Sequence, residues 1–181
     1  MKKWIALAAL VSAINCARPP DPQKAAGKPF EPAPAPPKAL ITTATFEPVY
    51  RAGKTIQGAT EAGVSLLKFT ELMQAFATEL GIAKDHELNA SDRQLLAIYR
   101  ESFEAYQDSR ALWLAKLKEG PVFDPGLHPD VVEIMKTYSV APYPNGNWNA
   151  DVAIQAVWKK AGERLDSATA LYLGKPTQTR S

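Results

Sequence analysis

Residues 48–83 decide the fold of this chain: PVYRAGKTIQGATEAGVSLLKFTELMQAFATELGIA. When this stretch is read in steps of three and four, its apolar and small side chains fall on one side of a helix. The opposite side is polar enough for water to cover it. The stretch therefore predicts one amphipathic helix over residues 48–83, roughly 50 Å long at 1.5 Å per residue. Its buried stripe is predicted to contain Ala52, Thr55, Ala59, Ala62, Leu66, Phe69, Met73, Phe76, Leu80 and Ala83.

The stripe changes in character along its length. Its side chains are small up to Ala62 and large from Leu66 onward. We therefore expect a neighbouring helix to approach closely in the first half, and the core to widen in the second half, beside which a pocket should be sought. Gly53, Gly58 and Gly63 would each cost roughly 0.5–1 kcal/mol relative to alanine inside a helix. Either close packing compensates for these glycines, or the helix frays or bends there.

A second helix is predicted over residues 91–119. The sequence SDRQ at its start is a capping box, in which the serine oxygen accepts from the backbone and the glutamine reaches back. Gly120, followed by proline, ends the helix. Arg110 falls in the same row as the apolar face of this helix, which is unusually aromatic. That face is predicted to contain Leu96, Tyr99, Phe103, Tyr106, Trp113 and Leu117.

Two more helices complete the predicted domain. A short helix is expected over residues 130–138, because Pro129 suits a first helical position. The last helix is expected over residues 150–173, with Asn149 as its N-cap. We therefore predict an all-α fold: a single antiparallel helical bundle of three long helices and one short helix over residues 48–174. A polar tail, residues 175–181, follows it.

The first residues are typical of an exported protein. Lys2 and Lys3 precede an apolar run that is too short to remain as a membrane-spanning helix, so residues 1–15 are predicted to be a secretory signal peptide. Residues 12–16, SAINC, resemble the lipobox of bacterial lipoproteins, in which the cysteine after the cut becomes lipidated. That family usually has leucine three residues before the cysteine and a small residue directly before it. Here Ala13 and Asn15 occupy those positions.

The resemblance implies that Cys16 carries a lipid anchor facing the periplasm. By similarity to enterobacterial sorting, Ala17 after the cysteine implies the outer membrane. The alternative is cleavage after Ala13, which would leave Cys16 as a free thiol on a soluble periplasmic or secreted protein. Since Cys16 is the sole cysteine, an intrachain disulfide and a cysteine-cluster zinc site are both excluded.

Residues 16–47 are predicted to form a linker between the anchor and the bundle. Nine of the fifteen prolines fall within residues 18–48, and proline fixes φ and removes a backbone donor. This composition favours an extended, polyproline-like spacer with a maximum reach of roughly 90 Å, at about 3.1 Å per residue. Residues 39–46 have some β propensity but no visible partner strand, so we expect them to be extended. The arrangement predicts a tether that holds a domain away from a membrane.

Charge and motifs exclude several classes of function. The net charge is +2. Lys2 and Lys3 lie in the predicted signal peptide, and without them basic and acidic residues balance, which leaves no electrostatic footprint for nucleic acid. The chain has no Glu-x-x-His pair for a di-iron site, no Cys-x-x-Cys-His for haem, no phosphate-binding glycine loop and no His-Glu-x-x-His. His86 and His128 both fall in predicted turns. We therefore expect no enzymatic activity, no cofactor and no metal.

The first candidate binding site is the row of Tyr99, Tyr106, Arg110 and Trp113. An arginine among aromatic rings should not be buried without a partner. Either it stacks on a ring and pairs with an acid on a neighbouring helix, or this face is partly open. An open face with a guanidinium and aromatic rings would suit an anionic ligand or a partner's peptide.

The second candidate is the loop APYPNGNW at residues 141–148. Its aromatic residues, Tyr143 and Trp148, either contact a partner or plug the end of the bundle around the short third helix. From these features we expect a non-catalytic cell-envelope lipoprotein whose tethered bundle binds another envelope protein or acts as an assembly subunit. The alternative is a periplasmic small-ligand-binding or sensory bundle that uses the aromatic and Arg110 face.

Overall fold

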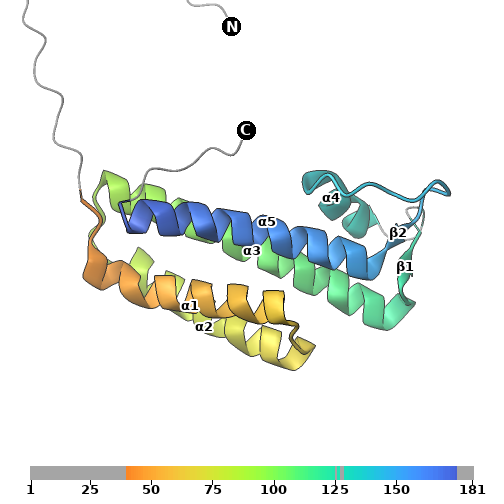
Figure 1. The fold of residues 1–181 in the computed structure, drawn as a ribbon, viewed down its shortest axis with the longest axis horizontal. Coiled ribbons are helices and arrows are strands. Elements are labelled where there is room, and N and C mark those ends of the chain that lie inside the picture. The colour runs from red at the N-terminus through yellow and green to blue at the C-terminus, as the bar shows by residue number, and fades with distance from the viewer. Residues whose placement is uncertain (1–39, 125, 127–128, 175–181) are drawn as a thin grey trace, which may run out of the picture. The chain divides into compact units, whose positions relative to one another are not determined.

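The computed structural model describes residues 40–124, 126 and 129–174 (Figure 1). The predicted signal peptide, Cys16, residues 16–39 of the predicted linker and the polar tail therefore lie outside the described residues. Helices dominate the part that is described, which confirms the prediction of an all-α chain. The elements are α1 (Thr43–Ala62), α2 (Leu66–Lys84), α3 (Ala90–Glu119), β1 (Val122–Phe123), α4 (Pro129–Thr137), β2 (Trp148–Asn149) and α5 (Ala150–Tyr172).

The stretch 48–83 forms most of two helices, so the prediction of one continuous helix was wrong. α1 ends at Ala62, and Gly63 follows with φ +89°, a backbone conformation that glycine adopts without steric cost. Ser65 then takes an extended conformation, and its hydroxyl accepts from the amide of Lys68 at 3.3 Å as the N-cap of α2. Of the two alternatives for the glycines, the chain therefore bends, and it does so at Gly63.

α1 starts at Thr43, so the expectation that residues 39–46 are extended was wrong for residues 43–46. The physical reason lies on another helix. The buried carboxylate of Asp92 accepts the Thr42 amide at 2.8 Å and the Thr42 hydroxyl at 2.7 Å. A charged acceptor at the first turn of a helix stabilises its unpaired amides. Pro48 lies inside α1 as a consequence of this early start.

Asp92 also takes part in the cap of its own helix. Asn89 is the N-cap of α3, because its side-chain oxygen accepts from the amides of Ser91 and Asp92, and the Asp92 carboxylate accepts from the Asn89 amide. The predicted capping box at residues 91–94 is therefore wrong by two positions. The predicted end at Glu119 is confirmed: Gly120 has φ +103°, and its amide donates to the carbonyl of Lys116.

The last two helices lie close to where the sequence placed them. α4 begins at Pro129 and ends at Thr137, one residue earlier than predicted at each end. Asn149 is the N-cap of α5, as predicted, and accepts from the amide of Val152 at 3.0 Å. The described residues also contain a two-residue antiparallel ladder that was not predicted, in which Val122 pairs with Asn149 and Phe123 pairs with Trp148.

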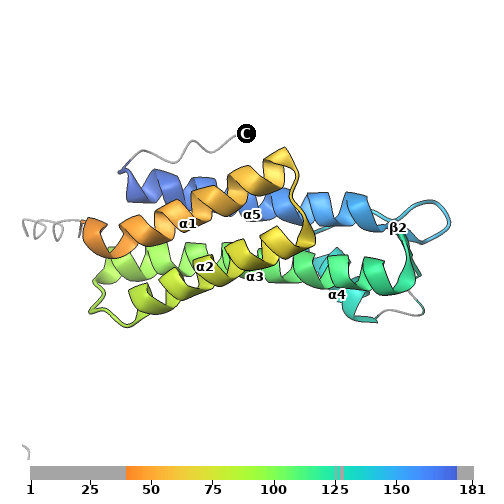
Figure 2. The ribbon, with the colours of Figure 1, turned by 90° about the horizontal axis from the view of Figure 1, so that it is seen from below.

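The four long helices contact one another in a closed cycle: α1 with α2, α2 with α3, α3 with α5, and α5 with α1 (Figures 1 and 2). Contacting pairs show that residue numbers rise on one helix as they fall on its neighbour, so neighbours run in opposite directions. These pairs are Glu47–Tyr172 and Gln57–Asp166 for α1 and α5, Thr70–Arg110 and Phe76–Phe103 for α2 and α3, and Ser102–Ala161 and Ser109–Trp158 for α3 and α5.

The buried side of α1 differs from the predicted stripe. Ala52 and Ala59 are only half-buried, and Thr55 and Ala62 are exposed. The close approach between helices that small residues predicted does occur, at Gly53, where an added Cβ would lie 3.0 Å from the Leu165 side chain of α5. The residues that are buried on α1 are Phe46, Val49, Gly53, Ile56, Gln57 and Thr60.

Four large side chains of α2, Phe69, Met73, Phe76 and Leu80, are buried as predicted, whereas Leu66 is only half-buried. Phe69 is fully buried, and its ring centroid lies 5.9 Å from that of Tyr106, 6.1 Å from Trp113 and 5.4 Å from Trp158. Such tilted and edge-on contacts add to the free energy gained from burying the rings. One aromatic cluster thus joins α2, α3 and α5.

The helices differ in length, and α3 and α5 continue past the hairpin of α1 and α2 (Figures 1 and 2). α4 does not replace the hairpin at this end. Tyr138, the residue directly after α4, reaches the opposite side of α3, where its hydroxyl donates to the Asp108 carboxylate at 2.7 Å. α2 therefore covers one side of α3 only as far as the level of Leu66, the first residue of α2. Beyond that level, toward the C-terminal end of α3, this side has no neighbouring helix among the described residues.

Candidate interaction surface

The structure divides the predicted row of α3 into buried and exposed members. Tyr99 and Tyr106 are fully buried, so neither ring is accessible to a ligand or partner. Burial raises the pKa of both phenols well above its ordinary value. Neither hydroxyl has a hydrogen-bond partner among the described residues, although the Thr60 hydroxyl lies near enough to Tyr106 to offset part of the rise in its pKa.

Arg110 and Trp113 are the partly exposed members of the row. The Arg110 Nε donates to the Thr70 hydroxyl at 3.3 Å, but no carboxylate in the described part of the chain forms an ion pair with the guanidinium. Trp113 contacts Phe69 and Trp158 on its inner side, with its centroid 5.5 Å from that of Trp158. These two residues lie where the part of α3 that α2 covers ends.

The two aromatic residues of the predicted loop have different surroundings. Trp148 is buried, belongs to β2, and donates its indole N–H to the carbonyl of Val140 at 2.9 Å. Its contacts are those of a residue that closes the end of the core. Tyr143 is exposed, and its backbone closes the turn through a 2.7 Å hydrogen bond to Asn147. The loop therefore offers a partner only one of its two aromatic rings.

Three exposed leucines occur near the C-terminal end of α3, two of them on α3 itself and one, Leu67, in the first turn of α2. Leu67 is 73% exposed, Leu114 is 41% exposed and Leu117 is 65% exposed. We call Leu67, Trp113, Leu114 and Leu117 the α3 ledge. Sequence reasoning placed Leu117 in the buried face of its helix, which was wrong, and assigned no role to Leu114.

The ledge arises from the position at which α2 begins. Because α2 and α3 are antiparallel and Thr70 meets Arg110, the first residue of α2, Leu66, lies at the level of Leu114. Leu117 lies one turn after Trp113 in the same row of α3. α2 covers this row only as far as the level of Leu114. A helix that continued through residue 63 would have covered Leu117. The break at Gly63 therefore exposes it.

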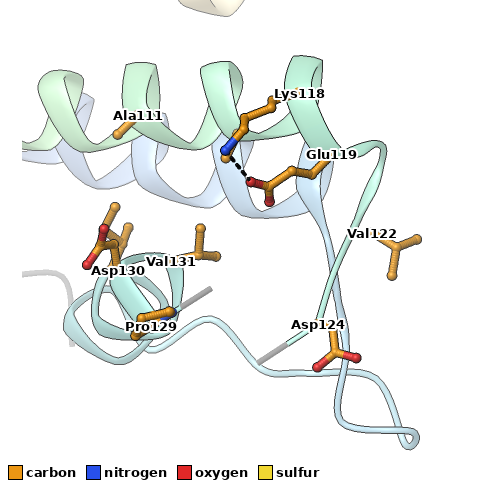
Figure 3. Close-up of a pocket in the computed structure, with 10 residues that line it drawn as sticks. Ala111, Lys118, Glu119, Val122, Asp124, Pro129, Asp130 and Val131 are labelled. Carbon is orange, nitrogen blue, oxygen red and sulfur yellow. Dashed lines mark ion pairs between the residues drawn. The ribbon is translucent and has the colours of Figure 1, made fainter. Parts of the chain in front are cut away.

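A hollow lies on the other side of α3, between α3, β1 and α4 (Figure 3). Its volume is about 830 Å³. Figure 3 shows the Lys118 ammonium paired with Glu119 on the α3 side of the hollow, and Pro129 and Asp130 on the α4 side. The paired atoms lie 3.5 Å apart. The lining residues are Ala111, Ala115, Lys118, Glu119, Val122, Asp124, Pro129, Asp130, Val131 and Ile134.

A smaller hollow of about 260 Å³ lies between α1 and α5. Gln57 and Thr60 line it from α1, and Trp158 and Gly162 line it from α5. The Gln57 side chain donates to Asp166 at 3.1 Å and accepts from Lys54 at 2.6 Å, so its amide is held in place. Neither hollow lies beside the large residues of α2, where the sequence suggested looking for a pocket.

Metal ligands and membrane spans are the remaining features that bear on function. No group of three or more histidine, cysteine, aspartate or glutamate side chains there is arranged to hold a metal ion. No helix in residues 40–124 or 129–174 is long and apolar enough to span a bilayer. No protein-family model, curated protein or solved structure matches the chain.

Proposed function

We propose that this protein is a lipid-tethered component of a bacterial cell envelope, in which an antiparallel helical bundle binds another protein through the α3 ledge. The observation that carries the proposal is the exposure of Leu114 and Leu117, which lie within about one turn of Trp113 on α3, together with the exposure of Leu67 in the first turn of α2. Apolar side chains scattered singly over a surface need no explanation, but neighbouring ones mark interaction sites. Trp113, Leu114 and Leu117 lie on α3 and Leu67 lies in the first turn of α2, and a site on helices loses little conformational entropy on binding.

The side chains of the ledge are of the kinds that stabilise protein interfaces. Burying a leucine contributes roughly 1.5–3 kcal/mol when it is fully removed from water. Tryptophan and arginine are the residues most often found to dominate binding free energy, and Trp113 and Arg110 lie together here. Since Trp113 already contacts two rings on its inner side, its position is fixed before a partner arrives.

The N-terminal sequence features support the membrane tether in the proposed function. The lipobox resemblance at residues 12–16 supports an anchor at Cys16, and the proline-rich linker supports a spacer. Where the linker meets the bundle, Thr42 is fastened to the buried Asp92, and the carbonyl of Leu40 accepts from the Asn89 side chain. A tether attached to α3 at this end would leave the ledge, at the other end of the helix, free to meet a partner.

Small-ligand binding by the aromatic row of α3 has less support. Two of its four members, Tyr99 and Tyr106, are buried inside the protein core.

The proposal also includes the lipid anchor at Cys16 and the periplasmic location. Mass spectrometry of the mature protein tests the anchor, because a diacylglyceryl group on Cys16 supports it and an unmodified N-terminus at residue 14 contradicts it.

A paired set of variants tests partner binding. The double substitution Leu114→Asp with Leu117→Asp places two charges on the ledge. The substitution Ile82→Asp places one on α2 at a distant site, where Ile82 is 53% exposed. Chemically crosslinked native envelopes would be solubilised, each variant purified, and the copurifying proteins quantified against the wild-type chain.

We expect the ledge variant to lose a specific copurifying protein that the wild type and Ile82→Asp both retain. All three should unfold at similar urea concentrations, because substitutions at exposed positions usually change stability by less than about 0.5 kcal/mol. A ledge variant that is folded and retains every partner of the wild type would refute the proposal.

A further inference from the structure

We infer that the α3 ledge accepts an amphipathic helix of the partner protein that carries acidic side chains beside its apolar face. This inference rests on the proposed function and adds the chemistry of the segment that binds. It follows from two independent features of the ledge, which are the rows of side chains on α3 and the distribution of charge around them.

The rows of α3 indicate a helix rather than a strand or loop. Arg110 and Leu114 are one turn apart, as are Trp113 and Leu117, so their side chains form two parallel ridges. Both ridges start in the part of α3 that α2 covers and continue beyond it. In the covered part, α2 fills the groove along these ridges, with Phe69 against Trp113 and Thr70 against Arg110. The same surface continues past the first residue of α2, so a second helix can lie there as an extension of α2.

The charges around the ledge favour an acidic partner. Residues 110–119 contain three basic side chains and one acidic side chain. Two of the three cations are already paired: Lys116 with Asp151 at 2.5 Å, and Lys118 with Glu119 at 3.5 Å. Arg110 has no carboxylate partner among the described residues. A partner's glutamate or aspartate would pair with it while the apolar face of its helix covers Leu114 and Leu117.

The same charges argue against a second copy of this chain as the occupant. In a symmetric dimer each residue patch meets the same patch of the partner. Arg110, the one of the three cations without a carboxylate partner in the described part of the chain, would then face the same basic patch of a second copy and gain no acid. A different protein with an acidic helix supplies the carboxylate.

Two synthetic helical peptides test the inference. Both would be about 15 residues long and stapled, because shorter unconstrained helices are marginally stable in water. They share leucines at i, i+3 and i+7, and differ only in flanking positions, which are glutamate in one and lysine in the other. Binding to the full chain in detergent micelles would be measured by titration calorimetry at two salt concentrations.

The acidic peptide should bind about tenfold more tightly than the basic one, and the difference should shrink at high salt. Arg110→Glu should weaken binding of the acidic peptide several-fold, by roughly what one ion pair contributes. Leu117→Asp should abolish binding of both peptides, whereas Ile82→Asp should change neither. Equal affinity for the two peptides would overturn the acidic partner, and the absence of binding by both would overturn the helix.

The proposed function can survive this failure, and the two outcomes are distinguishable. If neither peptide binds while the Leu114→Asp, Leu117→Asp variant still loses its envelope partner, the ledge binds protein but not an acidic helix. If sedimentation velocity shows a dimer that Leu117→Asp dissociates, the occupant is a second copy of the chain and the inference is wrong.

Discussion

The two ends of α3 differ in their surroundings rather than in their sequence pattern. Along the N-terminal two-thirds of α3, α2 covers the row of Tyr99, Phe103 and Tyr106, and the first and last of these rings are fully buried. Along the last third the same row continues as Trp113 and Leu117, but no part of α2 covers Leu117. Hydrophobic periodicity thus identifies which side of a helix is apolar, while the length of the neighbouring helix decides how much of it is buried.

The largest effect should come from removing a ring in the covered part. Phe69→Ala deletes the ring that contacts Tyr106, Trp113 and Trp158, and should lower the free energy of unfolding by about 3–5 kcal/mol. Leu117→Ala, on the ledge, should change it by less than about 0.5 kcal/mol. Urea denaturation followed by far-UV circular dichroism measures both. If the two variants lost similar stability, Leu117 would be a core residue and the ledge would not exist.

The second effect concerns the carboxylate that joins the start of α1 to the start of α3. Asp92→Ala removes the acceptor for both groups of Thr42 and for the Asn89 amide, and should cost about 2–3 kcal/mol. Asp151→Ala is the matched control, because its ion pair with Lys116 is exposed and contributes about 0.2–1 kcal/mol. Hydrogen exchange should also show faster opening of the first turn of α1 in Asp92→Ala alone. Unchanged protection at that turn would contradict the role of Asp92.

Two glycines of α1 should respond to alanine with opposite signs. At Gly53 the new Cβ would lie 3.0 Å from the Leu165 side chain in the buried interface with α5, so overpacking should cost about 1–3 kcal/mol. At Gly58 a Cβ would have no neighbour within 4 Å, so alanine should stabilise the helix by about 0.5–1 kcal/mol. Thermal melts of the two variants give the sign directly. A gain in stability at Gly53 would show that α1 and α5 do not approach closely there.

The smallest effect separates two buried tyrosines. Tyr106→Phe removes a hydroxyl that has no hydrogen-bond partner among the described residues, and should leave stability unchanged or raise it slightly. Tyr138→Phe removes the hydrogen bond to Asp108 and should cost about 1 kcal/mol. A clear loss at Tyr106, measured by urea denaturation, would mean that its hydroxyl is hydrogen-bonded after all.

Much of the fold can be predicted from the sequence, because helix ends are local. The end of α3 before Gly120 and the N-cap at Asn149 depend on residues within one turn, and both were predicted. The start of α1 could not be predicted in this way, because Thr42 is held by Asp92, fifty residues away in the sequence. Propensity alone favours an extended segment before Pro48, and a tertiary contact overrides it.

The candidate site was predicted less well, and one residue explains most of the error. Gly63 was identified as a position where the helix could bend, but the stripe from Ala52 to Ala83 was followed straight through it. A continuous helix would have covered Leu117, so this leucine was assigned to the core. The combination of Gly63 and the N-cap residue Ser65 was the signal of a hairpin. A predicted hairpin at this position would also have placed Trp113 and Arg110 at the edge of the core.

Site-specific photocrosslinking in intact cells tests most directly whether the uncovered end of α3 is where the protein acts. A photoreactive amino acid would replace Leu117 on the ledge in one strain and Ile82 on α2 in another, since both side chains are exposed. We predict a discrete covalent adduct with one other envelope protein at residue 117 and none at residue 82, and the adduct at 117 should disappear when Leu114→Asp is added. Equal adducts at both positions, or none at residue 117 in cells that express the folded protein, would contradict the account.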